Sequence, residues 1–131
     1  MRIQVVTEEA HGGGVAEAAR RPAIVEAYSP PRITRVAEKH GLRAGRSLDL
    51  TTRREDGRAW DFSRAWMREE ARELAARTRP RLLVGSPLCT SFSALQNLSK
   101  RGREEQLTRE RAAAEVHFRF CCRLYKDQVD R

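Results

Sequence analysis

A cysteine in a short loop bounded by glycine and proline is the residue of this chain best placed for covalent chemistry. Cys89 lies in Gly85-Ser86-Pro87-Leu88-Cys89-Thr90-Ser91-Phe92-Ser93, directly after the apolar run Leu82-Leu83-Val84. Such a run, without polar alternation, is typical of a strand buried on both faces of a parallel sheet. Open α/β sheets place their chemistry in the loops after the carboxyl ends of their strands. The thiol could act there as a nucleophile, or it could be a small hydrophobe in a tight loop.

The loop resembles the catalytic loop of the DNA cytosine-5 methyltransferases, whose pattern is Gly-Gly-Pro-Pro-Cys-x-x-Phe-Ser. The positions that match are Gly85, Pro87, Cys89, Phe92 and Ser93. The resemblance implies that Cys89 attacks C6 of a flipped cytosine, with Pro87 and Ser93 beside it in the catalytic site. It also implies S-adenosylmethionine as the cofactor, because in that family the activated C5 takes its methyl group from this molecule.

An acidic and an aromatic residue near the end of an earlier strand candidate, residues 23–28, extend the resemblance. Glu26, Tyr28 and Ser29 are in register with the family's Asp-x-Phe-Ala/Ser, which implies that they bind the cofactor. Pro30-Pro31-Arg32 stands where the family has glycines. Proline fixes φ and has no N–H to donate. We therefore expect the cradle for the methionine end of the cofactor to be altered or absent. The alternative is that this segment is a structural strand-turn-helix unit and no binding site.

Two further acidic residues could complete a nucleotide site. Asp49 lies in the next strand candidate, residues 47–50, and an acid at the end of a second strand binds ribose hydroxyls in nucleotide-binding folds. Asp61 with Phe62 occupies the place of a Gly-Asp-Ile that binds the adenine amino group in the resembled family. The alternatives are a surface turn for Asp49 and, for the aromatic residues Trp60 and Phe62, a role as core anchors.

Arginine dominates the charge of this 131-residue chain, in which 26 Lys and Arg against 18 Asp and Glu give a net charge of +8. A basic surface suits phosphate contacts, and arginine binds phosphate bidentately. Lys100, Arg101 and Arg103 follow the cysteine loop and are the candidates for contacts with the backbone of DNA; the alternative is a plain solvent loop. Many other arginines alternate with glutamates, as a solvated, ion-paired helix surface would also require.

The cysteine count indicates the compartment. Cys89, Cys121 and Cys122 are odd in number and two are adjacent, which is no disulfide framework and indicates a reducing, intracellular environment, in the cytoplasm or the nucleus. No segment is apolar enough to span a membrane. His117 and Cys121 are four residues apart, but two ligands do not make a zinc site, so no metal is expected.

The order of elements predicts an α/β fold, a Rossmann-like parallel sheet of about four short strands with flanking helices, truncated relative to a full methyltransferase domain. Residues 1–22 are expected to hold a short strand at 3–6 and a flexible segment, and residues 23–131 the partial methyltransferase domain. Helices are predicted over residues 33–40, 64–78 (with Ser63 as N-cap) and 105 to about 130.

The resemblance covers roughly residues 23–93 and implies a fragment of a DNA (cytosine-5) methyltransferase. The sequence stops before the family's Glu-Asn-Val and its target-recognition region, so we expect no independent turnover. A split enzyme completed by another chain, a longer parent protein and self-association are the possibilities. The alternative is a non-catalytic basic module, derived from such an enzyme, that binds nucleic acid or a partner. An amino-methyltransferase is a third hypothesis, because residues 86–89 are faintly similar to a Ser-Pro-Pro-Tyr/Trp loop. The missing aromatic residue counts against it.

Overall fold

The computed structural model describes residues 20–94, 98 and 101–131 and has an α/β fold. Its sheet is parallel and three-stranded, in the order β2-β1-β3, with β1 (Ile24–Ala27) between β2 (Ala44–Leu48) and β3 (Leu82–Gly85). The chain therefore adds β2 on one side of β1 and β3 on the other. Another expected strand, at residues 3–6, lies outside the described residues.

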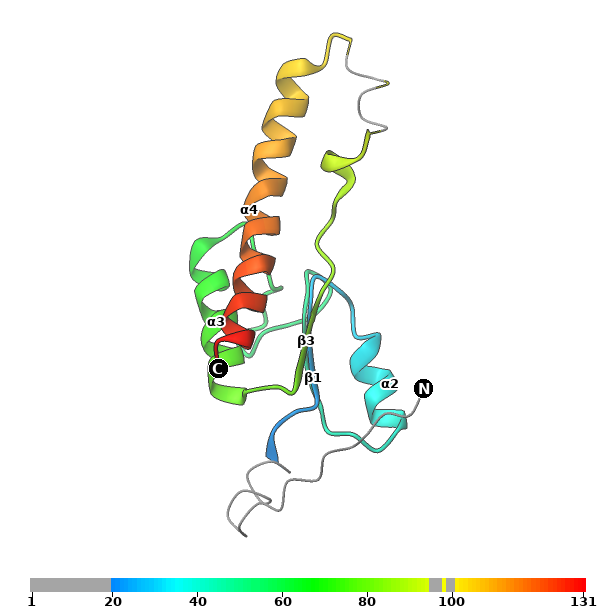
Figure 1. The fold of residues 1–131 in the computed structure, drawn as a ribbon, viewed down its shortest axis with the longest axis vertical. Coiled ribbons are helices and arrows are strands. Elements are labelled where there is room, and N and C mark those ends of the chain that lie inside the picture. Colours follow the sequence, from blue (N-terminus) through cyan, green and yellow to red (C-terminus); the bar gives the residue numbers. More distant parts are fainter. Residues whose placement is uncertain (1–19, 95–97, 99–100) are drawn as a thin grey trace.

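Helices cover both faces of the sheet, as expected. On one side of the sheet lies α2 (Ile33–Lys39), and on the other lie α3 (Ala65–Thr78) and α4 (Glu104–Val129) (Figure 1). The core lies on the side of α3 and α4. It consists of strand residues such as Val25, Ala27 and Leu83 packed against helix residues such as Leu74, Phe120 and Leu124.

Glu26 explains how α2 begins. Its side chain is 1% exposed, on the face of β1 opposite the core. Oε1 accepts hydrogen bonds from the main-chain amides of Arg32 (2.9 Å) and Thr34 (3.1 Å) and from the Thr34 hydroxyl (2.6 Å). Oε2 accepts one from the amide of Ile33 (3.3 Å). The carboxylate thereby satisfies amides that the first turn of a helix leaves without a partner.

Two strand expectations need correction. The run at 82–84 does form a strand, but it is not buried on both faces, because Leu83 is 6% exposed and Leu82 is 50% exposed. β3 is an edge strand, and α2 packs on β1 and β2 rather than on β3. The second strand begins at Ala44 instead of Ser47, where it pairs with Ile24, and it ends at Leu48.

Side chains of α4 close the outer edge of β3. The Tyr125 hydroxyl accepts a hydrogen bond from the amide of Gly85 (2.7 Å) and donates one to the carbonyl oxygen of the same residue (3.1 Å). Gln128 Nε2 donates to the Pro80 carbonyl oxygen (2.6 Å). These bonds occupy groups that an edge strand would otherwise offer to another chain.

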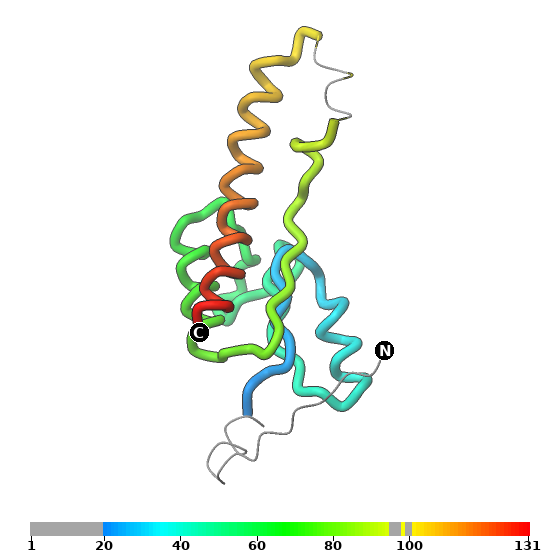
Figure 2. The backbone as a smooth tube through the Cα atoms, in the orientation of Figure 1, coloured from blue at the N-terminus to red at the C-terminus, as the bar shows by residue number. Residues whose placement is uncertain are grey.

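The first half of α4 extends beyond the sheet, beside residues 86–94, which leave β3 in an extended course and turn through the short 3-10 helix η1 (Thr90–Phe92) (Figures 1 and 2). α4 matches the predicted long helix within one residue at each end. In the described ranges, no helix combines the length and the apolar character that crossing a membrane requires.

Candidate functional site

A cavity of about 310 Å³ lies at the carboxyl edge of the sheet, where the strands end. Tyr28 follows β1, Asp49 and Leu50 follow β2, and Ser86 and Leu88 follow β3. The remaining lining residues come from the loop before α3 and from α4, and they are Trp60, Asp61, Phe62 and His117. Open α/β sheets bind ligands at this edge, at the point where the chain switches sides.

Four of the residues expected around a nucleotide line this one cavity: Tyr28, Asp49, Asp61 and Phe62. They come from three segments that are far apart in the sequence. The sequence spacing could not show that these segments meet; the parallel sheet brings their ends to the same edge.

The backbone of Tyr28 directs its side chain into the cavity. Alternation along a strand would place Tyr28 on the face of Glu26, toward α2. Its φ is 60°, a left-handed conformation that costs a residue with a side chain about 1–3 kcal/mol. The ring therefore packs on the opposite face, with centroid distances of 5.0 Å to Phe62 and 6.2 Å to Phe120.

Tyr28 pairs with a histidine of α4. Its hydroxyl lies 2.9 Å from Nδ1 of His117 and 3.4 Å from the main-chain oxygen of the same residue. Burial raises the pKa of Tyr28 well above its ordinary value, and nearby Cys121 raises it further. Burial also lowers the pKa of His117, with a smaller contribution from Arg68. Both side chains are therefore neutral near pH 7 and offer hydrogen bonds rather than charge.

The two aspartates differ in how far their carboxylates are already used. Oδ2 of Asp49 accepts bonds from the amide (3.0 Å) and hydroxyl (2.6 Å) of Thr51, which leaves Oδ1 to accept from a ligand. Oδ1 of Asp61 accepts from the hydroxyl (2.6 Å) and amide (3.1 Å) of Ser63, and Oδ2 lies 3.4 Å from Nε of Arg64. The Ser63 bonds are the main reason that the pKa of Asp61 is lowered. Ser63 is thus not the N-cap of α3; that position is Arg64.

Two of the expected cofactor residues do not line the cavity. The carboxylate of Glu26 is buried under α2 and is occupied by the amides of the first helical turn. The Ser29 hydroxyl donates to the Pro30 carbonyl oxygen (2.9 Å), and the Ser29 carbonyl oxygen accepts from the Ser47 hydroxyl. Both residues shape the strand-turn-helix unit in this structure.

The thiol of Cys89 lies one residue beyond the cavity lining. Leu88 contributes to the cavity, and Cys89 follows as an exposed free cysteine. Pro87 and Ser93 are half-buried on either side, and the Ser93 amide donates to the Thr90 carbonyl oxygen (3.1 Å). The loop therefore presents the thiol to solvent near the cavity rather than burying it as a small hydrophobe.

Contacts with α4 hold the cysteine loop. The ring of Phe92 lies 6.0 Å from that of Phe118, and Nε of Arg111 donates to the Ser91 carbonyl oxygen at 3.4 Å. Of the expected DNA contacts, Arg101 and Arg103 are exposed in the turn before α4. Lys100 lies outside the described residues.

Sequence reasoning did not place Trp60 or His117 in the site. His117 lies three residues before the buried Phe120 on the inner face of α4, so helical periodicity could have pointed to it. Trp60 is 4% exposed and is part of the core as well as of the cavity lining. The alternative of aromatic core anchors is therefore confirmed for Trp60 and Phe62, and both also face the cavity.

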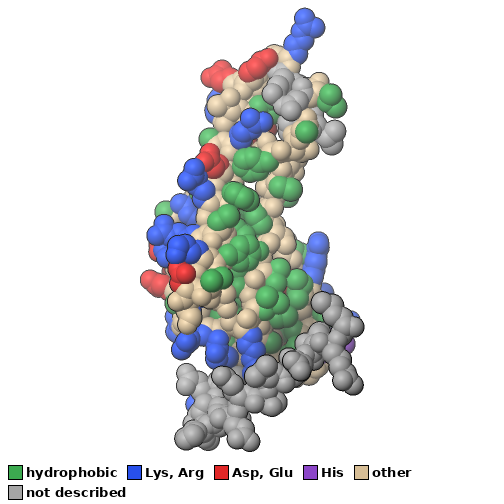
Figure 3. All heavy atoms as spheres, in the orientation of Figure 1, with side chains coloured by type: hydrophobic (Ala, Val, Ile, Leu, Met, Phe, Trp, Pro, Cys, Tyr) green, Lys and Arg blue, Asp and Glu red, His purple; other side chains and the backbone are tan. Residues whose placement is uncertain are grey.

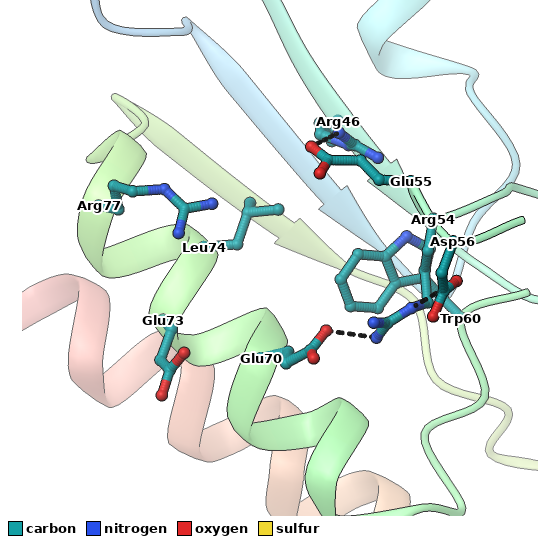
Figure 4. A pocket seen from close by; sticks show the side chains of 9 residues that line it. All are labelled: Arg46, Arg54, Glu55, Asp56, Trp60, Glu70, Glu73, Leu74 and Arg77. Atoms are coloured by element: carbon teal, nitrogen blue, oxygen red, sulfur yellow. Dashed lines mark hydrogen bonds and ion pairs between the residues drawn. The ribbon is translucent and has the colours of Figure 1, made fainter. Parts of the chain in front are cut away.

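A second hollow on the molecule, of about 370 Å³ between α3 and the 53–60 loop, is lined by charges of both signs (Figure 4). Arg54 lies over the rings of Trp60 (5.0 Å) and Trp66 (4.7 Å) and pairs with Glu70 and Asp56. Its charged lining residues are three arginines and four carboxylates: Arg46, Arg54, Arg77, Glu55, Asp56, Glu70 and Glu73. Arg54 pairs with Glu70 and Asp56, and Arg46 pairs with Glu55, so these carboxylates already have cationic partners and the hollow needs no anionic ligand.

The cavity at the carboxyl edge combines aromatic walls, a carboxylate oxygen able to accept from hydroxyl groups, and a neutral Tyr28–His117 pair, with an exposed thiol nearby. In the described part of the chain, no three His, Cys, Asp or Glu side chains are grouped so that they could hold a metal ion. The chain matches no protein-family model, no curated protein and no solved structure.

Proposed function

We propose that the chain is a Rossmann-like module of the DNA cytosine-5 methyltransferase type, whose cavity receives the nucleoside half of S-adenosylmethionine and whose Cys89 is the nucleophile. The observation that carries the proposal is the convergence of Tyr28, Asp49 and Asp61 on one cavity, beside Leu88 of the cysteine loop. When bound, S-adenosylmethionine supplies the methyl group.

The cavity suits the nucleoside half of this molecule better than its amino-acid half. A volume of about 310 Å³ is near the lower end of small-molecule sites. Oδ1 of Asp49 can accept from a ribose hydroxyl, and the Tyr28 and Phe62 rings can contact adenine. A methionine carboxylate would need the free amides at the start of α2, and Glu26 already occupies those of Arg32, Ile33 and Thr34.

We expect adenosine and S-adenosylmethionine to bind with similar dissociation constants, on the order of 1 mM, or about −4 kcal/mol. The reason is that the methionine half finds no free donors at α2. Ligand-observed NMR titrations of both compounds measure this. Tenfold tighter binding of S-adenosylmethionine would show that the amino-acid half is recognised after all. Absence of binding by both would refute the cavity as a nucleoside site.

A matched pair of variants locates the binding. Asp49→Asn removes a charge-assisted hydrogen bond to the ribose and should weaken both ligands about tenfold. Asp56→Asn makes the same chemical change outside the cavity and should leave both affinities unchanged. Equal effects of the two substitutions would contradict the assignment of Asp49.

The proposed reaction uses the thiolate of Cys89. It would add to C6 of a flipped cytosine and form a carbon–sulfur bond. C5 would then take the methyl group from the sulfonium of the bound cofactor, which would leave as the thioether; the proton on C5 would pass to solvent, and the C6–sulfur bond would break and release the thiolate. Pro87 and Ser93 shape the loop, while Lys100, Arg101 and Arg103 hold phosphates of the DNA strand. A reducing, intracellular compartment would keep the exposed thiol reduced.

DNA that contains 5-fluorocytosine tests the nucleophile. Fluorine on C5 cannot leave as a proton does, so the adduct should persist on a denaturing gel when S-adenosylmethionine is added. We expect a low yield, because weak binding leaves the cavity sparsely occupied. Cys89→Ser should abolish the adduct, and Cys122→Ser, which alters another exposed cysteine, should retain it.

The outcomes of this experiment separate the two functions. An adduct that still forms with the Cys89→Ser variant would show that Cys89 is not the nucleophile. No adduct with the unaltered chain at saturating S-adenosylmethionine would favour the non-catalytic module.

Support for a completing chain comes from apolar side chains beside the sheet, since Val36 and Leu82 are 52% and 50% exposed.

A further inference from the structure

The amino ends of the strands, opposite the nucleoside cavity, surround a hollow of about 390 Å³ that is rich in arginine. Its lining comes from the segment before β1, from the start of β2 and from the end of α3. The charged residues that line it are Arg20, Arg21, Arg43, Arg46, Arg77 and Arg79. No carboxylate is among the described lining residues, so the hollow concentrates positive charge.

Main-chain contacts hold two of these arginines in place. Nε of Arg21 donates to the Arg79 carbonyl oxygen (2.7 Å), and Nη1 of Arg43 donates to the Arg20 carbonyl oxygen. Each guanidinium has further N–H groups to offer a ligand. Figure 3 shows several Lys and Arg side chains close together in the lower part of the described residues, where β1 begins and α3 ends in Figure 1.

The charge here is not compensated as it is elsewhere on the surface. On α4, Arg109 pairs with Glu105 and Arg119 with Glu115. Around the hollow, the described residues provide one ion pair, between Arg46 and the highly exposed Glu55, at 3.7 Å. The other five arginines form none with the described carboxylates.

We propose that this hollow binds the phosphate backbone of a nucleic acid, independently of sequence. Arginine guanidinium groups match phosphate oxygens in geometry and keep their charge at all relevant pH values. The uncharged lining residues are Pro22, Ala44, Gly45 and Thr78. They offer no ring for stacking on a base and no carboxylate for a ribose, so the surface recognises phosphates alone.

The number and spread of the cations favour a polymer over a single phosphate group. Six arginines from three segments exceed what one phosphate can engage, whereas a nucleic-acid strand presents a phosphate every few ångströms. β1 has four residues and is about 13 Å long at about 3.3 Å per residue, so the hollow lies well away from the cavity at the other end of the sheet. The inference does not depend on the proposed methyltransferase chemistry.

Fluorescence anisotropy with a labelled 20-base-pair DNA of mixed sequence, at several NaCl concentrations, tests the inference. The double variant Arg77→Gln/Arg79→Gln removes two guanidinium groups that make no ion pair with described residues. We expect a loss of affinity on the order of tenfold, and a fall of about 2 in the slope of log K against log salt, because two phosphate contacts are lost.

The control double variant Arg109→Gln/Arg119→Gln removes the same net charge from α4. It should change affinity less than threefold, and thermal unfolding should show that both double variants are folded. Equal losses in the two double variants would mean that net charge alone attracts DNA and would overturn the inference. So would unchanged affinity in Arg77→Gln/Arg79→Gln.

Inorganic tripolyphosphate distinguishes the polymer from a small anion. We expect it to displace DNA only at concentrations far above the dissociation constant of the DNA complex. If calorimetry shows that the hollow binds tripolyphosphate more tightly than DNA, with the tripolyphosphate affinity lost in Arg77→Gln/Arg79→Gln, the site belongs to a small polyanion and the nucleic-acid assignment is wrong. None of these measurements uses S-adenosylmethionine, so their failure leaves the cavity proposal standing.

Discussion

Replacing Glu26 with alanine is expected to lower the free energy of unfolding by about 3 kcal/mol, because three main-chain amides and the Thr34 hydroxyl lose their acceptor in a buried place. A buried hydrogen-bonded group of this kind is among the few features whose loss costs so much. Chemical denaturation followed by circular dichroism measures the change. For a domain with a total stability of about 5–10 kcal/mol, the denaturation midpoint should fall by roughly 30–60%.

Glu38→Ala is the matched control for this prediction. Glu38 lies on the same helix, α2, but is exposed, so its removal should change stability by less than about 0.5 kcal/mol. If the two substitutions differ by under about 1 kcal/mol, the carboxylate of Glu26 does not hold α2 as the hydrogen bonds indicate.

Gly45→Ala should be comparably destabilising, by about 3 kcal/mol, because β1 and β2 have no room for a methyl group at this position. Ile24 pairs with Ala44 and Glu26 with Ser47, so β2 carries one extra residue, a bulge that includes Gly45. A Cβ on Gly45 would lie 2.3 Å from the Ile24 carbonyl oxygen and 2.7 Å from Cγ2 of Val25. The main chain of β1 would have to move. A thermal melt should show a clearly lower midpoint.

Gly57→Ala separates this clash from the general cost of replacing a glycine. Gly57 has a φ of +80°, and no atom lies within 4 Å of the place that a methyl group would take, so alanine there suffers only backbone strain of about 1 kcal/mol. A melting midpoint for Gly45→Ala equal to or above that of Gly57→Ala would contradict the crowding between β1 and β2.

Prolines that end helices and strands, and the periodic spacing of apolar residues in helices, make most elements predictable from the sequence. Pro80 precedes β3, Pro30 and Pro31 follow β1, and the apolar spacing of α3 and α4 repeats at a helical interval. The first half of β2 is not predictable in this way, because Gly45 and Arg46 do not favour a strand locally. Pairing with β1 holds them there, and that pairing is not visible in the local sequence.

The sequence predicts which residues line the cavity where they directly follow a strand. It does not predict them where the backbone conformation of a single residue decides which way its side chain points. Asp49 reaches the cavity because it follows β2, which ends at this edge of the sheet, whereas Asp61 reaches it from the loop between β2 and α3. Glu26 and Tyr28 are two residues apart, so alternation along a strand predicts the same face for both side chains. In the structure, Glu26 is buried under α2 and Tyr28 lines the cavity. The left-handed backbone of Tyr28 makes that difference, and residue type alone does not predict such a conformation for tyrosine.

One helix supports both halves of the proposed site through neighbouring residues. His117 of α4 bonds the Tyr28 hydroxyl at the cavity, and Phe118 packs on Phe92 of the cysteine loop. Consecutive side chains on an α-helix point about 100° apart, so a small rotation of α4 about its axis shifts both contacts together. If the cavity binds a cofactor and Cys89 is the nucleophile, as proposed, a rotation of α4 on ligand binding would also shift the cysteine loop, so that the two events would be coupled through one helix.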